Sequence, residues 1–350
     1  MKKILTIILV VVVVALALLW RSGDASKDHL EVKKVGVIIP LSGPASKIGE
    51  GLKRALDMAE PKNVELVYVD DECNTTKSIS AYNNLKTKGI KLYFVACSGS
   101  VMALAPLAKT DNNLIVTGYA GSSEIRKTGD EVIRLDPDAI SIGNALIKSI
   151  DGSVWSGKKY AIFYEKQDYA QSMVDALRSK FQSQVVAEES YLATDMSMKT
   201  QIAKLKNSEA NAIIYVPVSD KSADIVLKEM MDLKVNLPLI GEVNLCGFTS
   251  KPSQFGLHGF CLNQKIGTEG ARKFEKDYLA KYNTASQYPV NDGVSYDTIK
   301  IVDRIIGSGV DSISGLKKEI LKGVEGDIMT YKFEPNGEVI DEGYFIEEVF

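Results

Sequence analysis

The chain has 350 residues, of which 45% are hydrophobic, and it carries a formal net charge of −3 at pH 7. A chain of this length buries one large or two ordinary hydrophobic cores. Because the pI is about 5.7, the sequence offers no basic surface for a nucleic acid partner.

Residues 1–26 are predicted to be a targeting segment that lies outside the fold. Lys2 and Lys3 precede an apolar run of 17 residues, 4–20, which only Thr6 interrupts. This run exceeds the core of an ordinary signal peptide and is at the short limit for a membrane-spanning helix. The segment fits both interpretations, a cleaved signal peptide and an uncleaved membrane anchor. In either case residues 27–350 are expected outside the cytoplasm, because the positive charge stays inside.

The first half of the chain is predicted to alternate buried strands with helices. The apolar segments that predict strands are residues 35–39, 64–69, 92–96 and 114–117. Apolar side chains at helical spacing follow the first strand, from Ile48 to Ala59. This alternation indicates parallel βαβ units.

The same pattern begins again after Pro137. Strands are predicted at residues 160–164, 185–191, 212–216 and 239–240. The two sets meet near residues 134–160, so we expect two similar α/β lobes. The C-terminal part has helices predicted at 268–282 and 295–306 and alternating strands at 331–350, and periodicity alone does not assign it to either lobe.

The four cysteines favour disulfides over a metal site. They are Cys73, Cys97, Cys246 and Cys261, without a C-x-x-C pair, and the chain has only two histidines. An even number of cysteines in an exported chain suggests two disulfides. Cys73 and Cys97 each follow a predicted strand and could meet at one sheet edge, whereas Cys246 and Cys261 would close a local loop. Buried free thiols are the alternative.

The common enzyme motifs are missing from the sequence. No G-x-G-x-x-G follows the first strand, and there is no P-loop, no G-x-S-x-G and no H-E-x-x-H. Neither histidine is a candidate for catalysis. The sequence therefore predicts a protein that is not an enzyme and that uses neither a cofactor nor a metal.

Small residues with backbone and hydroxyl groups follow several strands. Ser98-Gly99-Ser100 begins a helix after the third strand, where free N–H groups and the helix dipole favour an anion. The alternative is that these serines only cap the helix. The other candidates at strand ends are Ala120-Gly121-Ser122, Tyr169 and Glu242. These candidates would together suit a small zwitterion, because they offer backbone groups, hydroxyls, one aromatic ring and one carboxylate.

Six segments resemble the solute receptors of ABC uptake systems of the leucine/isoleucine/valine-binding type. They are residues 35–44 (VGVIIPLSGP) with Gly49, 70–73 (DDEC), 97–100 (CSGS), 165–169 (EKQDY), 296–297 (YD) and 333–337 (FEPNG). The resemblance implies a type 1 periplasmic binding fold, α/β, with two doubly wound parallel-sheet lobes joined by a three-strand hinge. It also implies a Cys73–Cys97 disulfide.

The implied domains place residues 33–136 and 263–328 in one lobe and residues 137–262 and 329–350 in the other. The resemblance further implies that the lobes close on the ligand like a hinge.

By position, the resemblance implies that Ser98 binds the ligand carboxylate with nearby backbone N–H groups. Ala120 would offer its backbone, Tyr169 would cover the ligand, and Glu242 would pair with its α-ammonium. The family's threonine after the Ala120 position is Gly121 here, although Ser122 could supply a hydroxyl after a shift of one residue.

The expected function is therefore an extracytoplasmic receptor that delivers an amino acid-like ligand to an ABC permease. The expected partners are the ligand, the permease and, through the N-terminal segment, the membrane. A ligand-sensing ectodomain that reports to a signalling partner is the alternative, and an exported α/β enzyme is a third. The sequence leaves the ligand open among amino acids, amides and small carboxylates.

Overall fold

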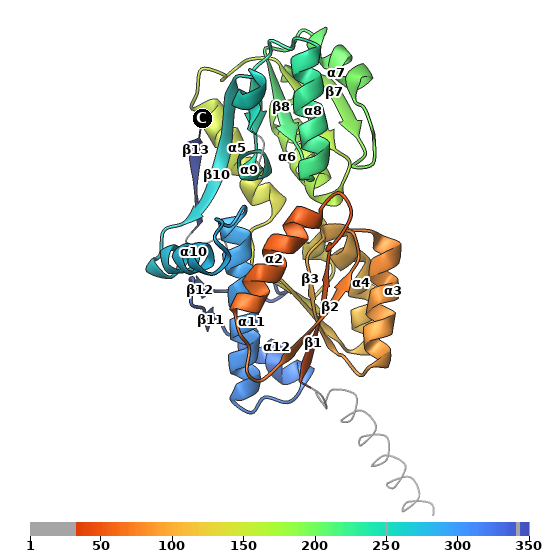
Figure 1. The fold of residues 1–350 in the computed structure, drawn as a ribbon, viewed down its shortest axis with the longest axis vertical. Helices are drawn as coiled ribbons and strands as arrows, with labels where there is room; N and C mark the ends of the chain where they lie inside the picture. Colours follow the sequence, from red (N-terminus) through yellow and green to blue (C-terminus); the bar gives the residue numbers. More distant parts are fainter. Residues whose placement is uncertain (1–32, 249–250, 341–343, 350) are drawn as a thin grey trace, which may run out of the picture.

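The computed structural model describes residues 33–248, 251–340 and 344–349. The predicted targeting segment at residues 1–26 lies outside the described residues. Within the described part, no helix combines the length and apolar composition needed to cross a membrane. Two lobes lie one above the other, each built on its own sheet (Figure 1).

The first lobe is built on a parallel sheet of five strands in the order β2-β1-β3-β4-β5. Its strands are β1 (Lys34–Ile39), β2 (Glu65–Asp70), β3 (Leu92–Val95), β4 (Leu114–Thr117) and β5 (Val132–Arg134). The connecting segments contain α2 (Ser46–Met58), α3 (Thr75–Thr87), α4 (Ser98–Asp111) and the short η1 (Ser123–Lys127). The four strands predicted from the sequence are all present, and β5 joins them.

The second lobe is built on a sheet of six strands in the order β13-β10-β9-β8-β6-β7, in which β13 alone is antiparallel to its neighbour. Its strands are β6 (Tyr160–Glu165), β7 (Val185–Tyr191), β8 (Ala212–Val216), β9 (Leu239–Gly241), β10 (Gly259–Ile266) and β13 (Tyr344–Val349). Its helical segments are α5 (Ala139–Asp151), α6 (Asp168–Phe181), η2 (Gln182–Gln184), α7 (Lys199–Lys206), α8 (Asp220–Asp232), α9 (Val243–Gly247) and η3 (Pro252–Phe255).

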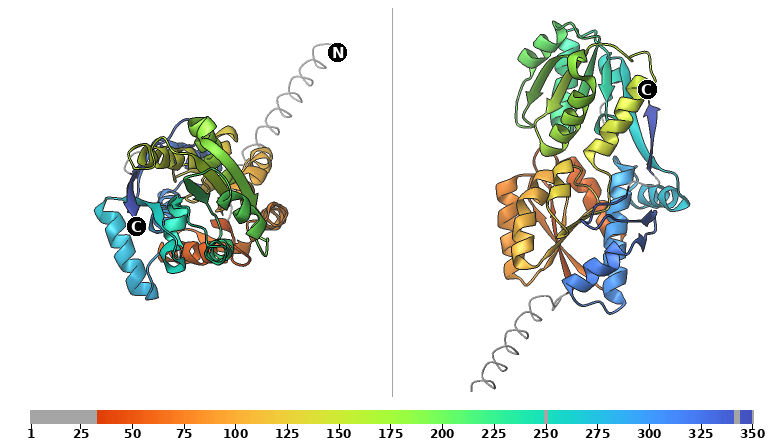
Figure 2. Two further views of the ribbon diagram at one scale, coloured as in Figure 1. Left: turned by 90° about the horizontal axis from the view of Figure 1, so that it is seen from above. Right: turned by 180° about the vertical axis from the view of Figure 1, so that it is seen from behind.

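The C-terminal helices return to the first lobe. They are α10 (Glu269–Tyr282), α11 (Pro289–Gly307) and α12 (Ile313–Leu321), and a small ladder of β11 (Val324–Glu325) and β12 (Thr330–Tyr331) follows them. Helix α11 packs along α2, and the right-hand view places the C-terminal helices beside the first lobe (Figure 2).

The chain therefore crosses between the lobes three times: after β5, after β10 and between β12 and β13. The sequence analysis placed a boundary between the lobes at residues 262 and 263, but strand β10 continues across it. The assignment of individual residues to the lobes therefore stays a proposal.

Local sequence explains where several of these helices begin. Asn74, Asp138, Thr268 and Ser312 each accept a hydrogen bond from a backbone N–H in the first turn of the helix that follows. At Gly49, in contrast, the reason is space, because a Cβ there would overlap the carbonyl group of Pro40. That glycine lets α2 pass directly against the end of β1 and so reach the cleft between the lobes.

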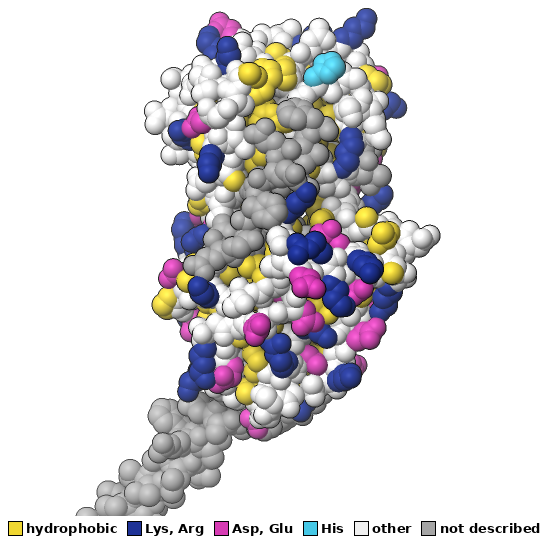
Figure 3. All heavy atoms as spheres, turned by 90° about the vertical axis from the view of Figure 1, so that its left-hand side faces the viewer, with side chains coloured by type: hydrophobic (Ala, Val, Ile, Leu, Met, Phe, Trp, Pro, Cys, Tyr) yellow, Lys and Arg dark blue, Asp and Glu magenta, His cyan; other side chains and the backbone are white. Residues whose placement is uncertain are grey.

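The surface carries charges of both signs. Figure 3 shows the side of the molecule that faces left in Figure 1. On the first lobe, Lys and Arg side chains are interspersed there with Asp and Glu. The charges on the face that is drawn are therefore mixed rather than gathered into one basic stripe.

Candidate functional site

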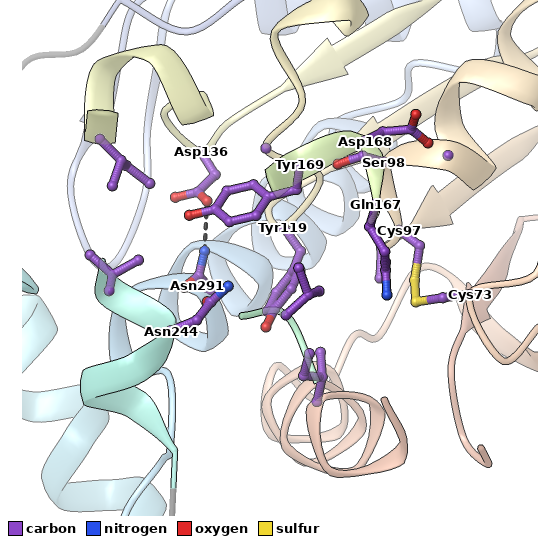
Figure 4. Close-up of a pocket in the computed structure, with 17 residues that line it drawn as sticks. Cys73, Cys97, Ser98, Tyr119, Asp136, Gln167, Asp168, Tyr169, Asn244 and Asn291 are labelled. Carbon is purple, nitrogen blue, oxygen red and sulfur yellow. Dashed lines mark hydrogen bonds between the residues drawn. A yellow bond between two sulfur atoms is a disulfide. The ribbon is translucent and has the colours of Figure 1, made fainter. Parts of the chain in front are cut away.

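A cavity of about 60 Å³ lies between the two lobes (Figure 4). Its walls come from the ends of β3 and β4, the first crossing, and helices α2 and α11 on one side, and from α5, α6, α9 and the segment after β8 on the other. The lining residues are Ile48, Cys73, Ala96, Cys97, Ser98, Gly99, Tyr119, Gly121, Asp136, Ile142, Gln167, Asp168, Tyr169, Val218, Val243, Asn244 and Asn291. The cavity is thus at the carboxyl ends of parallel strands, where α/β proteins bind ligands.

The N-terminus of α4 forms one end of the cavity. The helix begins at Ser98, and both Ser98 and Gly99 line the cavity. Cys97 precedes the helix and is joined to Cys73 by a disulfide. Ser98 Oγ accepts a hydrogen bond of 3.0 Å from the N–H of Ser122. The first backbone N–H groups of a helix carry partial positive charge, so this end suits an anionic group.

Ser100 points away from the cavity and fixes the base of α4. Its hydroxyl group donates a hydrogen bond of 2.7 Å to Asp71 Oδ2 and lies 2.7 Å from Ser78 Oγ. All three side chains are fully buried. Of the two serines in this turn, Ser98 therefore faces the cavity and Ser100 holds the helix in place.

In the turn after β4, Gly121 faces the cavity, whereas Ala120 and Ser122 support it. Arg134 Nη1 donates to the carbonyl oxygen of Ala120 at 3.1 Å and to that of Ser122 at 2.7 Å. The Ser122 hydroxyl lies 3.1 Å from Ser172 Oγ on α6 and so contacts the other lobe. A Cβ at Gly121 would lie 2.7 Å from Tyr169 Cδ2, so the aromatic ring uses the space that a larger residue would fill.

A hydrogen bond joins the side chains of Tyr169 and Glu242 in the second lobe. Tyr169 donates its hydroxyl to Glu242 Oε2 at 3.0 Å, and the N–H of Asn244 donates to the same oxygen at 2.9 Å. Glu242 is fully buried, and among the described residues its Oε1 has no hydrogen-bond partner. Burial raises the pKa of Glu242 to about 8. Glu242 is not part of the lining, but it contacts two residues that are.

The sequence analysis missed Asp136, which lines the cavity from the first crossing. Its side chain is 2% exposed, and its Oδ2 accepts a hydrogen bond of 2.6 Å from Asn291 Nδ2. Figure 4 shows Asp136, Asn244 and Asn291 near the hydroxyl end of Tyr169, with Ser98, Cys97 and Gln167 toward the other end. Asp136 lies two residues after the end of β5, so a prediction of that strand would have marked it as a candidate.

The surroundings of the cavity are acidic. Burial raises the pKa of Tyr119 well above its ordinary value, and the neighbouring carboxylates Asp292, Asp136, Asp220 and Glu242 raise it further. A fifth acid, Asp168, lies over Gly99 and lines the cavity. Among the described lining residues there is no Lys, Arg or His. The site therefore suits a ligand with a positively charged group.

The second disulfide lies away from the cavity. It joins Cys246 in α9 to Cys261 in β10. The structure thus contains both cysteine pairs that the sequence suggested, and only the Cys73–Cys97 pair contributes to the cavity wall.

A family model described as periplasmic binding protein matches residues 33–301. The chain belongs to this family. Among curated proteins, the Leu/Ile/Val-binding protein homolog 3 of Brucella melitensis is 22% identical over 212 residues, which are 55% of this chain and 56% of that protein. The chain therefore aligns with little more than half the length of that relative.

Two solved structures show the same fold. LivJ of Streptococcus pneumoniae in complex with isoleucine has a TM-score of 0.74 at 19% identity, over 88% of this chain and 94% of LivJ. An ABC transporter solute-binding protein of R. palustris in complex with benzoate has a TM-score of 0.78 at 18% identity, over 90% of this chain and 92% of that protein. The predicted fold class, two α/β lobes of the type 1 periplasmic binding fold, is confirmed.

Proposed function

We propose that the protein is an extracytoplasmic solute receptor that captures an amino acid-like zwitterion between its lobes and delivers it to an ABC permease. The observation that carries this proposal is the polarity of the interlobe cavity. One end has the N-terminus of α4, and the other has the buried carboxylate of Glu242 in contact with the lining. A carboxylate and an ammonium on one small ligand match these two ends.

In this proposal Ser98 and Gly99 bind the ligand carboxylate with the Ser98 hydroxyl and backbone N–H groups. Gly121 offers its backbone to the ligand, and Tyr169 covers the ligand from the second lobe. Glu242 pairs with the α-ammonium. The support from Ser100, Ala120 and Ser122 is indirect, because their side chains or carbonyl groups bond to protein partners.

The acidic surroundings favour an amine over an aromatic carboxylate. The two structural relatives described above hold isoleucine and benzoate, and only isoleucine carries an ammonium. A buried carboxylate is costly unless a positive charge or several donors offset it. The ammonium of an amino acid can pair with the carboxylates of Glu242 and Asp136, whereas benzoate brings no positive charge to them.

The experiment is isothermal titration of the full-length protein with the common L-amino acids and benzoate. We expect heat of binding with at least one amino acid and none with benzoate. Ser98→Ala should weaken that binding by about 1–3 kcal/mol, the cost of losing a hydrogen bond to a charged group. Ser80→Ala removes an exposed hydroxyl from α3 in the same lobe and should change nothing. Binding of benzoate but of no amino acid would refute the proposal.

A further inference from the structure

Helix α9 brings neighbouring residues to the interlobe cavity, although it is only five residues long. Val243 and Asn244 line the cavity, and Glu242 caps the helix and accepts hydrogen bonds from Tyr169 and Asn244. Asn244 also donates its Nδ2 to the carbonyl oxygen of Pro217 at 3.1 Å. These bonds hold the first residues of α9. Because so short a helix is not stable by its own hydrogen bonds, the position of its other end depends on the structure around it.

A second cavity, of about 210 Å³, lies beside α9 in the second lobe. Its lining is mostly apolar and consists of Leu239, Leu245, Cys246, Lys251, Pro252, Ser253, Leu257, Gly259, Phe260 and Cys261. Val243 and Asn244 thus line the interlobe cavity, whereas the next two residues of the helix, Leu245 and Cys246, line the second cavity. A side chain beside a cavity makes fewer packing contacts, so packing holds α9 less firmly on this side.

The Cys246–Cys261 disulfide joins α9 to β10, and both cysteines line this second cavity. Their Cα atoms are 5.6 Å apart. Cys261 pairs in the sheet with Gly241 of β9, the residue before Glu242. A Cβ at Gly241 would lie 3.0 Å from Cys261 Cβ and closer still to Leu245. The end of β9, helix α9 and the disulfide are therefore closely packed together.

Strand β10 is a rigid attachment point for the disulfide because it pairs with a strand on each side. Residues 259–261 are parallel to β9, and residues 261–266 are antiparallel to β13. Backbone that is hydrogen-bonded within a sheet opens less often than a loop. The second of the three crossings between the lobes follows directly after this strand. The disulfide thus connects a helix at the interlobe cavity to a strand that leads into the hinge.

The other contacts of the C-terminal end of α9 depend on the loop after it or on the first lobe. Lys251 donates a hydrogen bond to the carbonyl oxygen of Cys246, but Lys251 lies in the loop that the disulfide closes. Gly247 and Phe248 pack against Tyr288, which precedes α11 beside the first lobe. The contact with Tyr288 therefore holds α9 only while the two lobes are together.

We propose that the Cys246–Cys261 disulfide is a positioning element for ligand binding, which holds α9 at the interlobe cavity while the lobes are apart. With α9 held, Glu242 and Asn244 meet the ligand in an ordered arrangement. Without the disulfide, part of the binding free energy goes into ordering the helix, so ligand affinity falls. This inference rests on the proposed function, in which Glu242 pairs with the α-ammonium of the ligand.

The first test replaces both cysteines in the full-length protein, once as Cys246→Ala/Cys261→Ala and once as Cys246→Ser/Cys261→Ser. Isothermal titration with the common L-amino acids measures affinity. We expect the amino acid that binds the unmodified protein most tightly to bind both double variants about ten-fold or more weakly. Leu205→Ala is the control, because it truncates a fully buried side chain of α7 in the same lobe. It should lower the urea midpoint but leave affinity within about two-fold.

The second test is hydrogen exchange of the ligand-free proteins, which separates the position of α9 from a general loss of stability. We expect residues 243–248 to exchange faster in both double variants than in the unmodified protein, while β6 and β8 exchange as before. In Leu205→Ala, residues 243–248 should exchange at the rate of the unmodified protein.

Affinity of the double variants within about two-fold of the unmodified protein would overturn the inference, and so would an equal loss of affinity in Leu205→Ala. If neither double variant folds, the disulfide is needed for the whole lobe, and the inference is overturned as well. If no amino acid binds the unmodified protein, the proposed function fails. The exchange of residues 243–248 needs no ligand and then decides by itself whether the disulfide holds α9.

Discussion

Glu242 combines a charged group with complete burial, and this combination makes it sensitive to pH. Among the described residues, its carboxylate accepts hydrogen bonds from neutral donors: the Tyr169 hydroxyl, the backbone N–H of Asn244 and the backbone of Leu245. Since the desolvation outweighs these bonds, its pKa rises from an ordinary 4.5 to about 8. Without ligand the residue holds a proton near neutral pH, and a cationic ligand group would displace that proton.

The first prediction is that Glu242→Gln alters the pH dependence of stability. Between pH 4.5 and 8 the folded protein holds a proton on Glu242 that the unfolded chain has released. The free energy of unfolding therefore falls as pH rises, by up to about 1.4 kcal/mol per pH unit from this group. Its contribution is complete below pH 4.5 and is lost as pH rises through about 8.

Urea denaturation of the ligand-free protein at several pH values measures this effect. Asp292, whose pKa burial raises to about 7, titrates in both proteins, so the difference between them isolates Glu242. We expect Glu242→Gln to gain stability relative to the unmodified protein as pH rises from 5 to 8. Parallel profiles for the two proteins would contradict the prediction.

A second prediction concerns the close contact of Gly121 with Tyr169. In Gly121→Ala the new Cβ would lie 2.7 Å from Tyr169 Cδ2, so the rigid ring would have to leave the position in which it lines the cavity. We expect ligand affinity to fall about ten-fold, or about 1.4 kcal/mol. The measurement is isothermal titration with the preferred amino acid.

Gly143→Ala is the control for this substitution. A Cβ at Gly143 has its nearest neighbour, Met173 Cγ, at 3.5 Å, which is an ordinary contact. Ligand affinity should be unchanged in this variant. If Gly121→Ala also binds within two-fold of the unmodified protein, the ring is free to adjust and does not fix the shape of the cavity.

The sequence predicted individual residues best where a strand runs directly into a turn. Ser98, Gly99, Gly121 and Tyr169 all line the cavity, because the carboxyl ends of parallel strands meet at one edge of each sheet. Which of two neighbouring serines faces the cavity depends on partners distant in sequence. Ser100 turns toward Asp71, 29 positions earlier in the chain, and sequence spacing does not reveal that bond.

At the scale of elements, α4 is held at its N-terminus by a buried polar cluster. Asp71 accepts hydrogen bonds from the N–H of Cys73 at 3.0 Å and from the hydroxyls of Ser78 and Ser100 at 2.8 and 2.7 Å. This carboxylate thereby connects the end of β2, the first turn of α3 and the first turn of α4. The Cys73–Cys97 disulfide also joins the segment between β2 and α3 to the residue that precedes α4.

The third prediction is that this cluster stabilises the first lobe. Asp71→Ala leaves a backbone N–H and two buried hydroxyls without their acceptor, at a cost of about 2–3 kcal/mol in the free energy of unfolding. Asp71→Asn keeps one acceptor oxygen and should lose less. Urea denaturation without reducing agent gives both values.

Asp175→Ala, on the exposed face of α6, serves as the control and should cost less than about 0.5 kcal/mol. An Asp71→Ala variant as stable as this control would show that Ser78 and Ser100 satisfy each other without the carboxylate.

Three strands, β5, β10 and the two-residue β11, were not predicted, and the first two were missed for different reasons. Strand β5 has three residues, which is too short for an apolar period to be read. Strand β10 mixes Asn263, Gln264 and Lys265 with apolar residues, and its pairing with β9 and β13 comes from tertiary structure. The first omission hid Asp136, so a missed element became a missed site residue.

At the scale of the whole molecule, Arg134 connects the cavity to the hinge. Its guanidinium bonds to the carbonyl groups of Ala120 and Ser122 beside Gly121, and it pairs with Glu338 in the third crossing. Asp138, 3.6 Å from Arg134 Nη2, caps the first helix of the second lobe. The buried guanidinium of Arg134 thus contacts the turn after β4 that lines the cavity. It also contacts two of the three crossings and the residue that caps α5.

The last prediction separates the two roles of Arg134. Arg134→Met leaves the carboxylate of Glu338, 4% exposed, buried without its partner, at a cost of about 3–5 kcal/mol in stability. Adding Glu338→Leu removes that carboxylate, so the double variant should recover most of the lost stability. Neither variant restores the donors to the carbonyl groups of Ala120 and Ser122, so both should bind ligand at least ten-fold more weakly than the unmodified protein. Urea denaturation and isothermal titration on the same samples measure the two effects. Affinity that recovers together with stability would mean that Arg134 acts only through its ion pair and does not position the cavity turn.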